Sequence, residues 1–349
     1  MGMIKLPQSS INFFKDNLDE IFQTGNLAEG KWNQELCNHV AEFCGVRNAA
    51  ATSSNGAGLV ALMMIYKEYF SRTEVLMQSN TMYGVKTMVA TAGCNLSGYI
   101  DCELTTLMPS FDQVHKAVSD YKGAKNNLMI LLSHIGGIIN PAMEKIAAYC
   151  TENNIVLLED CAHSYGATLN GKHSGAFGDG GVFSFYATKS IPAGEGGVVI
   201  TKHDDIGDYI KRYIIYDRFK QEMRIGNNNR PSEVQALLIY AAVKYTDENI
   251  ANKKQTAQFY IKACKDLGIP YIKQEDINSV GNYYKFVIFN ENKPISEYLP
   301  VLKTKTSPVY DYALGNSKII TTHHACLPIW YGQESEVTKK AIEELYASR

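Results

Sequence analysis

The regular alternation of short apolar runs with helical patterns between residues 49 and 201 limits the fold of this chain more than any other feature. Seven runs have the length and residue types of buried strands, and they lie at residues 49–53, 74–79, 96–101, 128–134, 155–159, 182–186 and 197–201. Strands that alternate with helices build a mostly parallel sheet with helices on both faces. The sequence therefore predicts an α/β fold, in which ligands bind beyond the carboxyl ends of the strands.

Helical patterns flank and separate these runs. Residues 11–43 are predicted to be mostly helical, with an exposed loop at residues 23–32 that contains two glycines. A further helix is predicted over residues 141–153, with Asn140 as its cap and Pro141 at its first position.

The pattern changes after residue 209. A polar segment leads into one long helical stretch at residues 232–267, and weaker strand and helix patterns follow as far as residue 349. These changes predict a large domain at residues 1–245 and a smaller α+β domain at residues 246–349. Whether the N-terminal helices pack on the small domain is left open.

Composition limits the classes of partner. The chain has 349 residues and a net charge of −2, so it offers no basic surface for nucleic acid or anionic lipid. No apolar run reaches the roughly 20 residues that cross a bilayer, and a cytoplasmic location is expected. The eight cysteines show no CxxC pair and no clustering with histidine, so we expect buried thiols and no metal site.

Two chemically reactive side chains follow two of the predicted strands. The run at residues 155–159 ends in Glu159 and Asp160, with His163 three residues on, and Lys189 follows the run at residues 182–186. A lysine that forms a Schiff base and a carboxylate that keeps a pyridine nitrogen protonated are the minimum apparatus for pyridoxal phosphate (PLP). A strand-end acid and a loop lysine are also common without a cofactor, so these residue types leave both interpretations open.

The segment AAATSSNGAG at residues 49–58 predicts a strand, a polar turn and a helix that opens near Gly56. Unpaired N–H groups and the helix dipole converge at such a point and favour a phosphate. The alternative is an ordinary strand-to-helix turn with a Ser or Asn cap.

The segments EDCAHSYGA and GDGGVFSFYATKSIPAGEGGVVIT closely resemble the DegT/DnrJ/EryC1/StrS family of PLP-dependent sugar aminotransferases, which have fold type I. The resemblance covers order, spacing and residue type over about 45 residues. Weaker similarity extends over residues 11–236 and ends with ACLPIW near residue 327. It implies a PLP-binding large domain built on a seven-stranded, mostly parallel sheet.

The resemblance also implies roles for individual residues. Lys189 would form the Schiff base and move the proton, Asp160 would pair with the pyridinium nitrogen, and His163 would lie beside the ring. The remaining implied cofactor contacts are Ser184 and the turn Asn55, Gly56 and Ala57 at the phosphate, Met82 or Tyr83 stacked on the ring, and Asn228 reaching the phosphate of a neighbouring subunit. The protein would then be a homodimer with shared active sites. Ala57 stands where the family usually has Thr, which removes one hydroxyl contact.

For the reaction, the resemblance implies transfer of an amino group from glutamate to a keto-sugar acceptor that is nucleotide-linked. Residues 231–348 contain no arginine, and arginine is the usual bidentate clamp for the α-carboxylate in amino-acid aminotransferases. Glutamate would then have to be held by Arg218, Arg224, Arg230 or lysines. Two alternatives remain. One is a PLP-dependent sugar dehydratase on the same scaffold, in which histidine usually replaces the lysine, and the other is a PLP-binding regulatory protein without catalysis.

Overall fold

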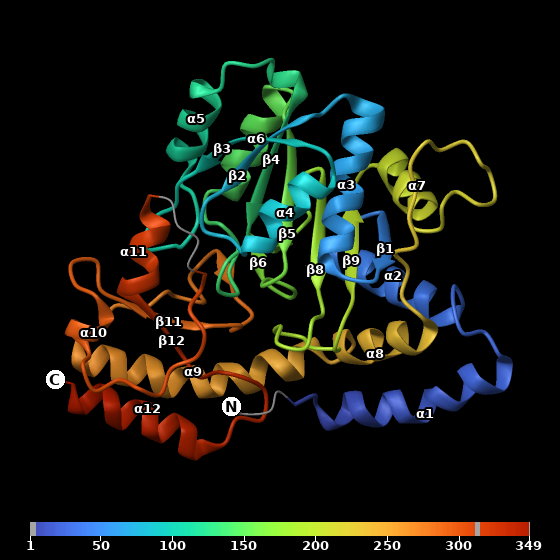
Figure 1. The fold of residues 1–349 in the computed structure, drawn as a ribbon. Helices are drawn as coiled ribbons and strands as arrows, with labels where there is room; N and C mark the ends of the chain where they lie inside the picture. Colours follow the sequence, from blue (N-terminus) through green and yellow to red (C-terminus); the bar gives the residue numbers. More distant parts are fainter. Residues whose placement is uncertain (1–4, 311–314, 349) are drawn as a thin grey trace.

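Seven strands form the central sheet and confirm the seven predicted runs. The computed structural model describes residues 5–310 and 315–348. The strands are β1 (Asn48–Thr52), β2 (Glu74–Gln78), β3 (Asn95–Ile100), β4 (Leu128–Ser133), β5 (Val156–Cys161), β8 (Gly180–Ser184) and β9 (Gly197–Thr201). Their order is β1-β9-β8-β5-β4-β2-β3, and β9 alone runs antiparallel to its neighbours. The carboxyl ends of β4, β5 and β8 therefore meet at the same end of the sheet (Figure 1).

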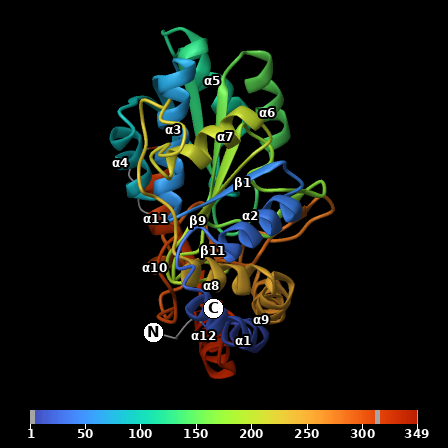
Figure 2. The same cartoon turned by 90° about the vertical axis from the view of Figure 1, so that its right-hand side faces the viewer.

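Helices cover both faces of the sheet, because successive side chains of a strand point to opposite sides. Val75 and Met77 pack into the core beneath α3, α4 and α7, whereas Leu76 packs beneath α5 and α6. These helices are α3 (Asn55–Phe70), α4 (Tyr83–Thr91), α5 (Phe111–Asp120), α6 (Met143–Glu152) and α7 (Asp204–Tyr213). Figure 2 shows α3 and α6 on opposite sides of the strands. Among the helices described, none is both long and apolar enough to cross a membrane.

The N-terminal helices α1 (Gln8–Thr24) and α2 (Lys31–Cys44) are joined by a loop where the sequence predicts one. Both pack on α8 (Glu233–Val243), and the Trp32 ring lies 5.9 Å from the Phe13 ring. The buried Glu233 carboxylate accepts from the N–H of Trp32 at 2.7 Å, which caps the start of α2. These two helices thus pack chiefly on α8, and α1 also reaches residue 248, where the Ser9 hydroxyl donates to the Glu248 carboxylate.

Two predicted helix boundaries are wrong. Helix α6 begins at Met143 and not at Pro141, because Asn140 forms a turn in which its Oδ1 accepts from the Ala142 N–H at 2.9 Å. The stretch at residues 232–267 is two helices, α8 and α9 (Thr246–Leu267), separated at Lys244 and Tyr245. No glycine or proline marks this break, so the sequence pattern did not indicate it.

The C-terminal part has a core of its own. Strands β11 (Phe286–Phe289) and β12 (His324–Leu327) pair antiparallel and pack with α9, α10 (Ile295–Tyr298) and α12 (Ser335–Ala347), while α11 (Asn316–His323) precedes β12. Figure 1 shows α9 and α12 side by side. A small sheet of β10 (Ser279–Val280), β6 (Thr168–Leu169) and β7 (Lys172–His173) joins this part to the central sheet. We propose a domain boundary between residues 245 and 246, as predicted, because this core begins with α9.

A glycine loop after β4 holds the C-terminal part against the central sheet. The Asn282 N–H donates to the Gly137 carbonyl at 2.9 Å, and the Lys285 N–H donates to the Gly136 carbonyl at 3.1 Å. Gly137 has φ +104°, and a Cβ there would lie 2.8 Å from the backbone nitrogen of Tyr284. Only glycine therefore allows the segment at residues 282–285 to lie this close to the end of β4.

Replacement of Gly137 by alanine should push the segment at residues 282–285 away from the loop after β4. Gly171 provides a matched control, because its φ is +75° but nothing lies within 4 Å of an added Cβ. We expect Gly171→Ala to cost about 1 kcal/mol of unfolding free energy, since both variants carry the left-handed backbone strain. Gly137→Ala should cost a further 1 to 3 kcal/mol, roughly, because it also overpacks the contact. Urea unfolding of both variants measures the difference, and equal costs would contradict the close approach.

Candidate active site

Asp160 lies near the end of β5, and donors from three parts of the chain hold its buried carboxylate. Its Oδ1 accepts from Asn55 Nδ2 and from the Ala162 N–H, both at 3.1 Å, and its Oδ2 accepts from the Ser133 hydroxyl at 3.1 Å. A buried carboxylate is costly unless polar groups satisfy it. These bonds fix its orientation at the carboxyl ends of the parallel strands.

Lys189 lies in the segment between β8 and β9, where two turns fold the chain back. The Lys189 N–H donates to the Tyr186 carbonyl, and the Ala187 N–H donates to the Gly194 carbonyl, both at 2.9 Å. Burial lowers the pKa of Lys189 to about 8, the charge of Asp160 raises it, and the charge of Lys285 lowers it. The structure thus brings the predicted lysine and carboxylate into one electrostatic environment.

His163 is buried between two tyrosine rings. Its Nδ1 accepts from the Gly136 N–H at 3.4 Å, so the neutral ring carries its proton on Nε2, which donates to the Tyr310 hydroxyl. Burial and the charges of Lys189 and Lys285 hold the pKa of His163 well below its usual value. His163 is therefore a neutral hydrogen-bonding group on the same side of the sheet as Lys189.

The turn before α3 has the expected form, with one difference. The Ser54 hydroxyl caps the helix by accepting from the Ala57 N–H at 3.1 Å. The side chain of Asn55 points away from the turn: it donates to Asp160 and, at 2.9 Å, to the Val182 carbonyl. An anion at this turn would therefore meet the helix N-terminus through backbone N–H groups and not through the Asn55 amide.

Ser184 lies beside this turn. It pairs across the sheet with Gly197, where an added Cβ would lie 2.6 Å from the carbonyl carbon of Ser54. The Ser184 Oγ accepts from the Tyr186 N–H at 3.4 Å, which leaves its own proton to donate. Ser184 and the first turn of α3 thus form one polar corner that suits a phosphate.

The structure does not bring every predicted residue into contact with Lys189. Met82 and Tyr83 lie at the start of α4 and are 40% and 60% exposed. Asn228 is exposed, and its Oδ1 accepts from Arg230 at 2.7 Å. The neighbouring Asn229 carbonyl accepts from the Ser53 N–H, so this segment lies close to the phosphate corner. The stacking residue and the contact across subunits remain predictions.

Residues from the C-terminal part complete the site, and the sequence did not reveal them. The Tyr284 ring lies 4.3 Å from the His163 ring and 5.7 Å from Lys189 Nζ, and Lys285 Nζ lies 5.2 Å from the same ring. The buried Asn282 fixes this segment by donating to the His163 carbonyl at 2.8 Å and the Tyr165 carbonyl at 2.9 Å. The sequence feature that could have indicated these residues is the run of polar and aromatic residues just before β11.

Two further buried groups support the loops of the site. Glu159 accepts from His134 at 2.8 Å and from the N–H of Gly178 at 2.6 Å, so the motif acid beside Asp160 is structural. Lys253 on α9 donates to the carbonyl and hydroxyl of Ser190, the residue after Lys189. Helix α9 is therefore tied directly to the segment that carries Lys189.

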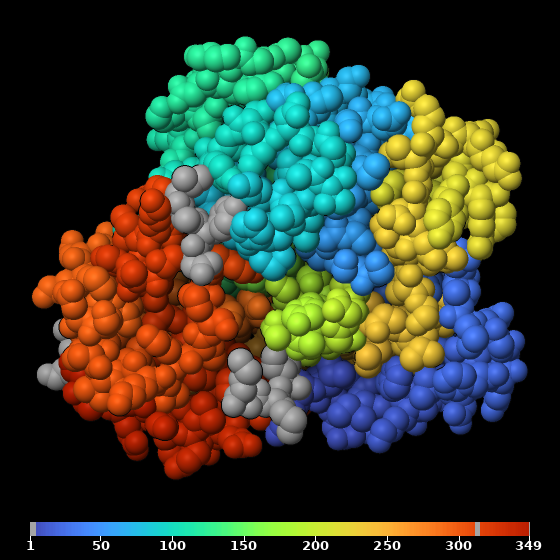
Figure 3. Space-filling model, viewed as in Figure 1, coloured from blue at the N-terminus to red at the C-terminus, as the bar shows by residue number. Residues whose placement is uncertain are grey.

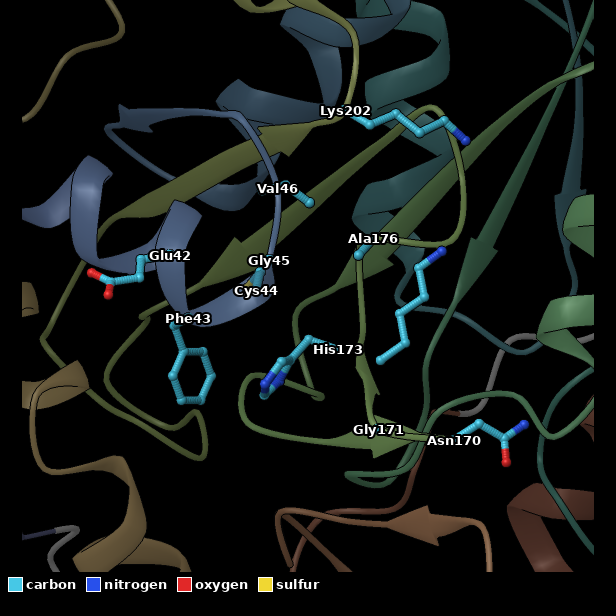
Figure 4. A pocket seen from close by; sticks show the side chains of 11 residues that line it. Glu42, Phe43, Cys44, Gly45, Val46, Asn170, Gly171, His173, Ala176 and Lys202 are labelled. Atoms are coloured by element: carbon cyan, nitrogen blue, oxygen red, sulfur yellow. The ribbon is translucent and has the colours of Figure 1, made fainter.

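The site opens on one face of the molecule. Figure 3 shows the yellow-green segment between β8 and β9 at the bottom of a hollow, between α4 in cyan and the C-terminal part in orange and red. A separate cavity of about 590 Å³ lies between the end of α2 and the β6–β7 hairpin, and Figure 4 shows its lining residues. That cavity contains none of the predicted site residues.

These features fit PLP. A largely buried lysine of lowered pKa suits the aldehyde of the cofactor. A fixed carboxylate suits its pyridine nitrogen, and a helix N-terminus beside a serine suits its phosphate. A lysine–carboxylate pair at the carboxyl ends of parallel strands, next to a phosphate corner, defines the class of PLP-binding α/β proteins.

Within that class, the comparison with known families is decisive. The sequence profile of the DegT/DnrJ/EryC1/StrS aminotransferase family matches residues 8–344. The chain therefore belongs to this family, and the resemblance carried by the motifs at residues 159–201 is confirmed.

Individual relatives agree with this assignment. The chain is 25% identical to GDP-perosamine synthase of Escherichia coli O157:H7, over 81% of this chain and 77% of that protein. It is also 25% identical to dTDP-3-amino-3,4,6-trideoxy-alpha-D-glucose transaminase of Micromonospora megalomicea subsp. nigra, over 80% and 74%. The PLP form of Spr1654 from Streptococcus pneumoniae has the same fold, with a TM-score of 0.81, 14% identity and coverage of 99% and 97%.

The electrostatic environment of Lys189 can be measured in the protein without cofactor. We expect its amine to titrate near pH 8, because burial disfavours the charged form. Asp160→Asn should lower this pKa further, since it removes a charge that favours the ammonium form. The control Asp112→Asn, at an exposed position on α5, should leave it unchanged. The rate of trinitrophenylation at Lys189 against pH measures the pKa, and a higher value in Asp160→Asn would contradict this geometry.

Proposed function

We propose that this chain is a PLP-dependent aminotransferase that moves an amino group from glutamate to a nucleotide-linked keto-sugar. The observation that carries the proposal is the meeting of Lys189 and Asp160 at the carboxyl end of the sheet, in a chain of this family. Relatives named for GDP-linked and dTDP-linked amino sugars support a nucleotide-linked acceptor. They differ in nucleotide and sugar, so they do not select one acceptor.

The residues divide the work of holding PLP. Lys189 would hold it covalently through Nζ, Asp160 would bond to the ring nitrogen, and Ser184 and the first turn of α3 would bind the phosphate. When bound, the cofactor supplies an electron sink that stabilises negative charge on the carbon next to the substrate amine.

The chain's own groups provide the proton chemistry. A pKa of about 8 gives Lys189 a larger neutral fraction at neutral pH than an ordinary lysine has, so its Nζ can take up a proton. Asn55 and Ser133 hold Asp160 as an acceptor, so a remaining lone pair of its carboxylate would accept from the protonated ring nitrogen. Neutral His163 carries its proton on Nε2, which donates to the Tyr310 hydroxyl, so the two side chains would position an oxygen of the ring together.

Replacement of Lys189 tests the proposed reaction. Wild-type protein loaded with PLP should be yellow, and borohydride should fix the cofactor to the peptide that contains Lys189. Lys189→Ala should lose the fixation and, by more than roughly a thousandfold, the glutamate-dependent conversion to the pyridoxamine form. The control Lys262→Ala, at an exposed position on α9, should behave as wild type. Glutamate-dependent conversion in Lys189→Ala would exclude this lysine, and water elimination from a sugar without amino transfer would favour the dehydratase alternative.

The proposal includes a homodimer with shared active sites in the cytoplasm. Large apolar side chains are exposed in the single chain at Met82, Tyr83, Tyr186, Tyr216 and Phe219. Their segments lie on the face that carries the site hollow (Figure 3). Exposed apolar surface of this kind marks association sites. Asn228 is also exposed, on the polar segment that contains Tyr216 and Phe219, where it can contact the phosphate corner of a partner subunit.

Subunit mixing tests whether Asn228 acts across the interface. Asn228→Asp should weaken PLP binding by charge repulsion with the phosphate, and Lys189→Ala should be inactive. If Asn228 serves the partner, a hybrid of the two variants has one intact site and one doubly altered site. Random mixing should then restore about one quarter of wild-type activity. No recovery in hybrids whose formation is verified by native mass spectrometry would place Asn228 in its own subunit's site or outside both sites.

A further inference from the structure

Lys285 carries a positive charge near the site, and none of the proposed contacts to PLP uses it. Its backbone N–H donates to the Gly136 carbonyl at 3.1 Å, and its carbonyl accepts from Gln274 Nε2 at 3.3 Å. Both ends of this peptide segment are thus anchored, one of them to the loop after β4. The side chain of Lys285 therefore starts from a defined point beside the site.

The ammonium of Lys285 faces the same aromatic ring as that of Lys189. The two Nζ atoms lie 5.2 Å and 5.7 Å from the centre of the Tyr284 ring. The charge of Lys285 lowers the pKa values of both Lys189 and His163, as a positive charge at close range should. Lys285 therefore lies close enough to the reacting lysine for the two charges to interact.

Lys285 has no acidic partner in residues 5–310 and 315–348, whereas Lys254 on α9 pairs with Glu275 at 2.7 Å. The other groups that face Lys285 are Cys326, neutral His163 and the Tyr284 ring. The carboxylate that raises the pKa of Lys189 is that of Asp160, which accepts from Asn55 and Ser133. Within the described part of the chain, Lys285 thus lies beside a second cation with no carboxylate of its own.

An anionic ligand relieves this excess positive charge. The amine of an amino donor must reach the position of Lys189 Nζ, and in an α-amino acid a carboxylate is attached to the carbon next to that amine. Residues 231–348 contain no arginine, so the usual bidentate clamp is absent from this part of the chain. Lys285 is a cation that the C-terminal part places beside Lys189, and, unlike Lys253, its ammonium is not bonded to Ser190.

We propose that Lys285 binds a carboxylate of the amino donor while the donor's amine reacts beside Lys189. The inference rests on the proposed aminotransferase function and adds a recognition residue for its first substrate. A single ammonium gives one point of attachment where arginine gives two. The donor is therefore held less rigidly than in an arginine clamp, which suits a site that must also admit a bulky sugar.

The test separates the donor half of the reaction from the acceptor half. Lys285→Met keeps the length of the side chain and removes its charge, and Lys285→Arg keeps the charge. In PLP-loaded protein, Lys285→Met should raise the glutamate concentration for half-maximal conversion of the cofactor band on the order of 10- to 100-fold. Lys285→Arg should recover most of this loss. Reaction of the pyridoxamine form with a nucleotide-linked keto-sugar should change less than about threefold.

A binding measurement provides a readout that does not depend on turnover. Glutarate is an unreactive dicarboxylate, and its calorimetric affinity for the PLP-loaded protein should fall in Lys285→Met by the same factor as that for glutamate. The control Lys262→Met should retain the wild-type value, since this residue lies exposed on α9. An unchanged cofactor absorbance in each variant verifies that the site is folded.

Two results would overturn the proposal. One is a glutarate affinity in Lys285→Met within twofold of wild type, and the other is a defect confined to the keto-sugar half-reaction, which would assign Lys285 to the acceptor. If wild-type protein converts no amino donor at all, the aminotransferase proposal fails. The glutarate measurement still decides whether Lys285 is a carboxylate site in that case.

Discussion

The buried carboxylate of Asp160 is the interaction on which the arrangement of this site depends. An ionised carboxylate that is almost fully removed from water is tolerated only when hydrogen-bond donors surround it. Here the donors come from the first residue of α3, the last residue of β4 and the loop after β5. One charge therefore holds three chain segments in register at the end of the sheet. The corner that suits a phosphate and the position of Lys189 are built around it.

The C-terminal part contributes to the chemistry because its attachment is rigid. The buried Asn282 bonds to the loop after β5, and the segment that follows it lies against Gly136 and Gly137 with no room for a side chain. Tyr284 and Lys285 are consequently held at fixed points near His163 and Lys189. Among the described residues, the two ammonium groups and the neutral imidazole near Asp160 favour the binding of an anion.

Most of the fold could be predicted because its signals are local. The seven strands are short apolar runs between helical patterns, and the structure places them within two residues of their predicted ends. The errors occur where local signals are weak. The break between α8 and α9 carries no glycine or proline, and Asn140 forms a turn where a helix cap was expected. The bond of the Asn55 side chain to Asp160 had no signal in the sequence, because it joins residues 105 positions apart.

The sequence by itself determined the family and the seven strands of the sheet, and it predicted the pair Lys189 and Asp160, because these depend on local patterns and on spacing within one continuous motif. The tertiary structure alone decided which residues face that pair from the other part of the chain. Tyr284, Lys285 and Lys253 reach the site through packing between elements about 65 to 125 residues apart in the chain, which no local pattern encodes. Lys285 in particular resembles any surface lysine in the sequence, and only its placement opposite Lys189, without an acidic partner among the described residues, gives it chemical significance.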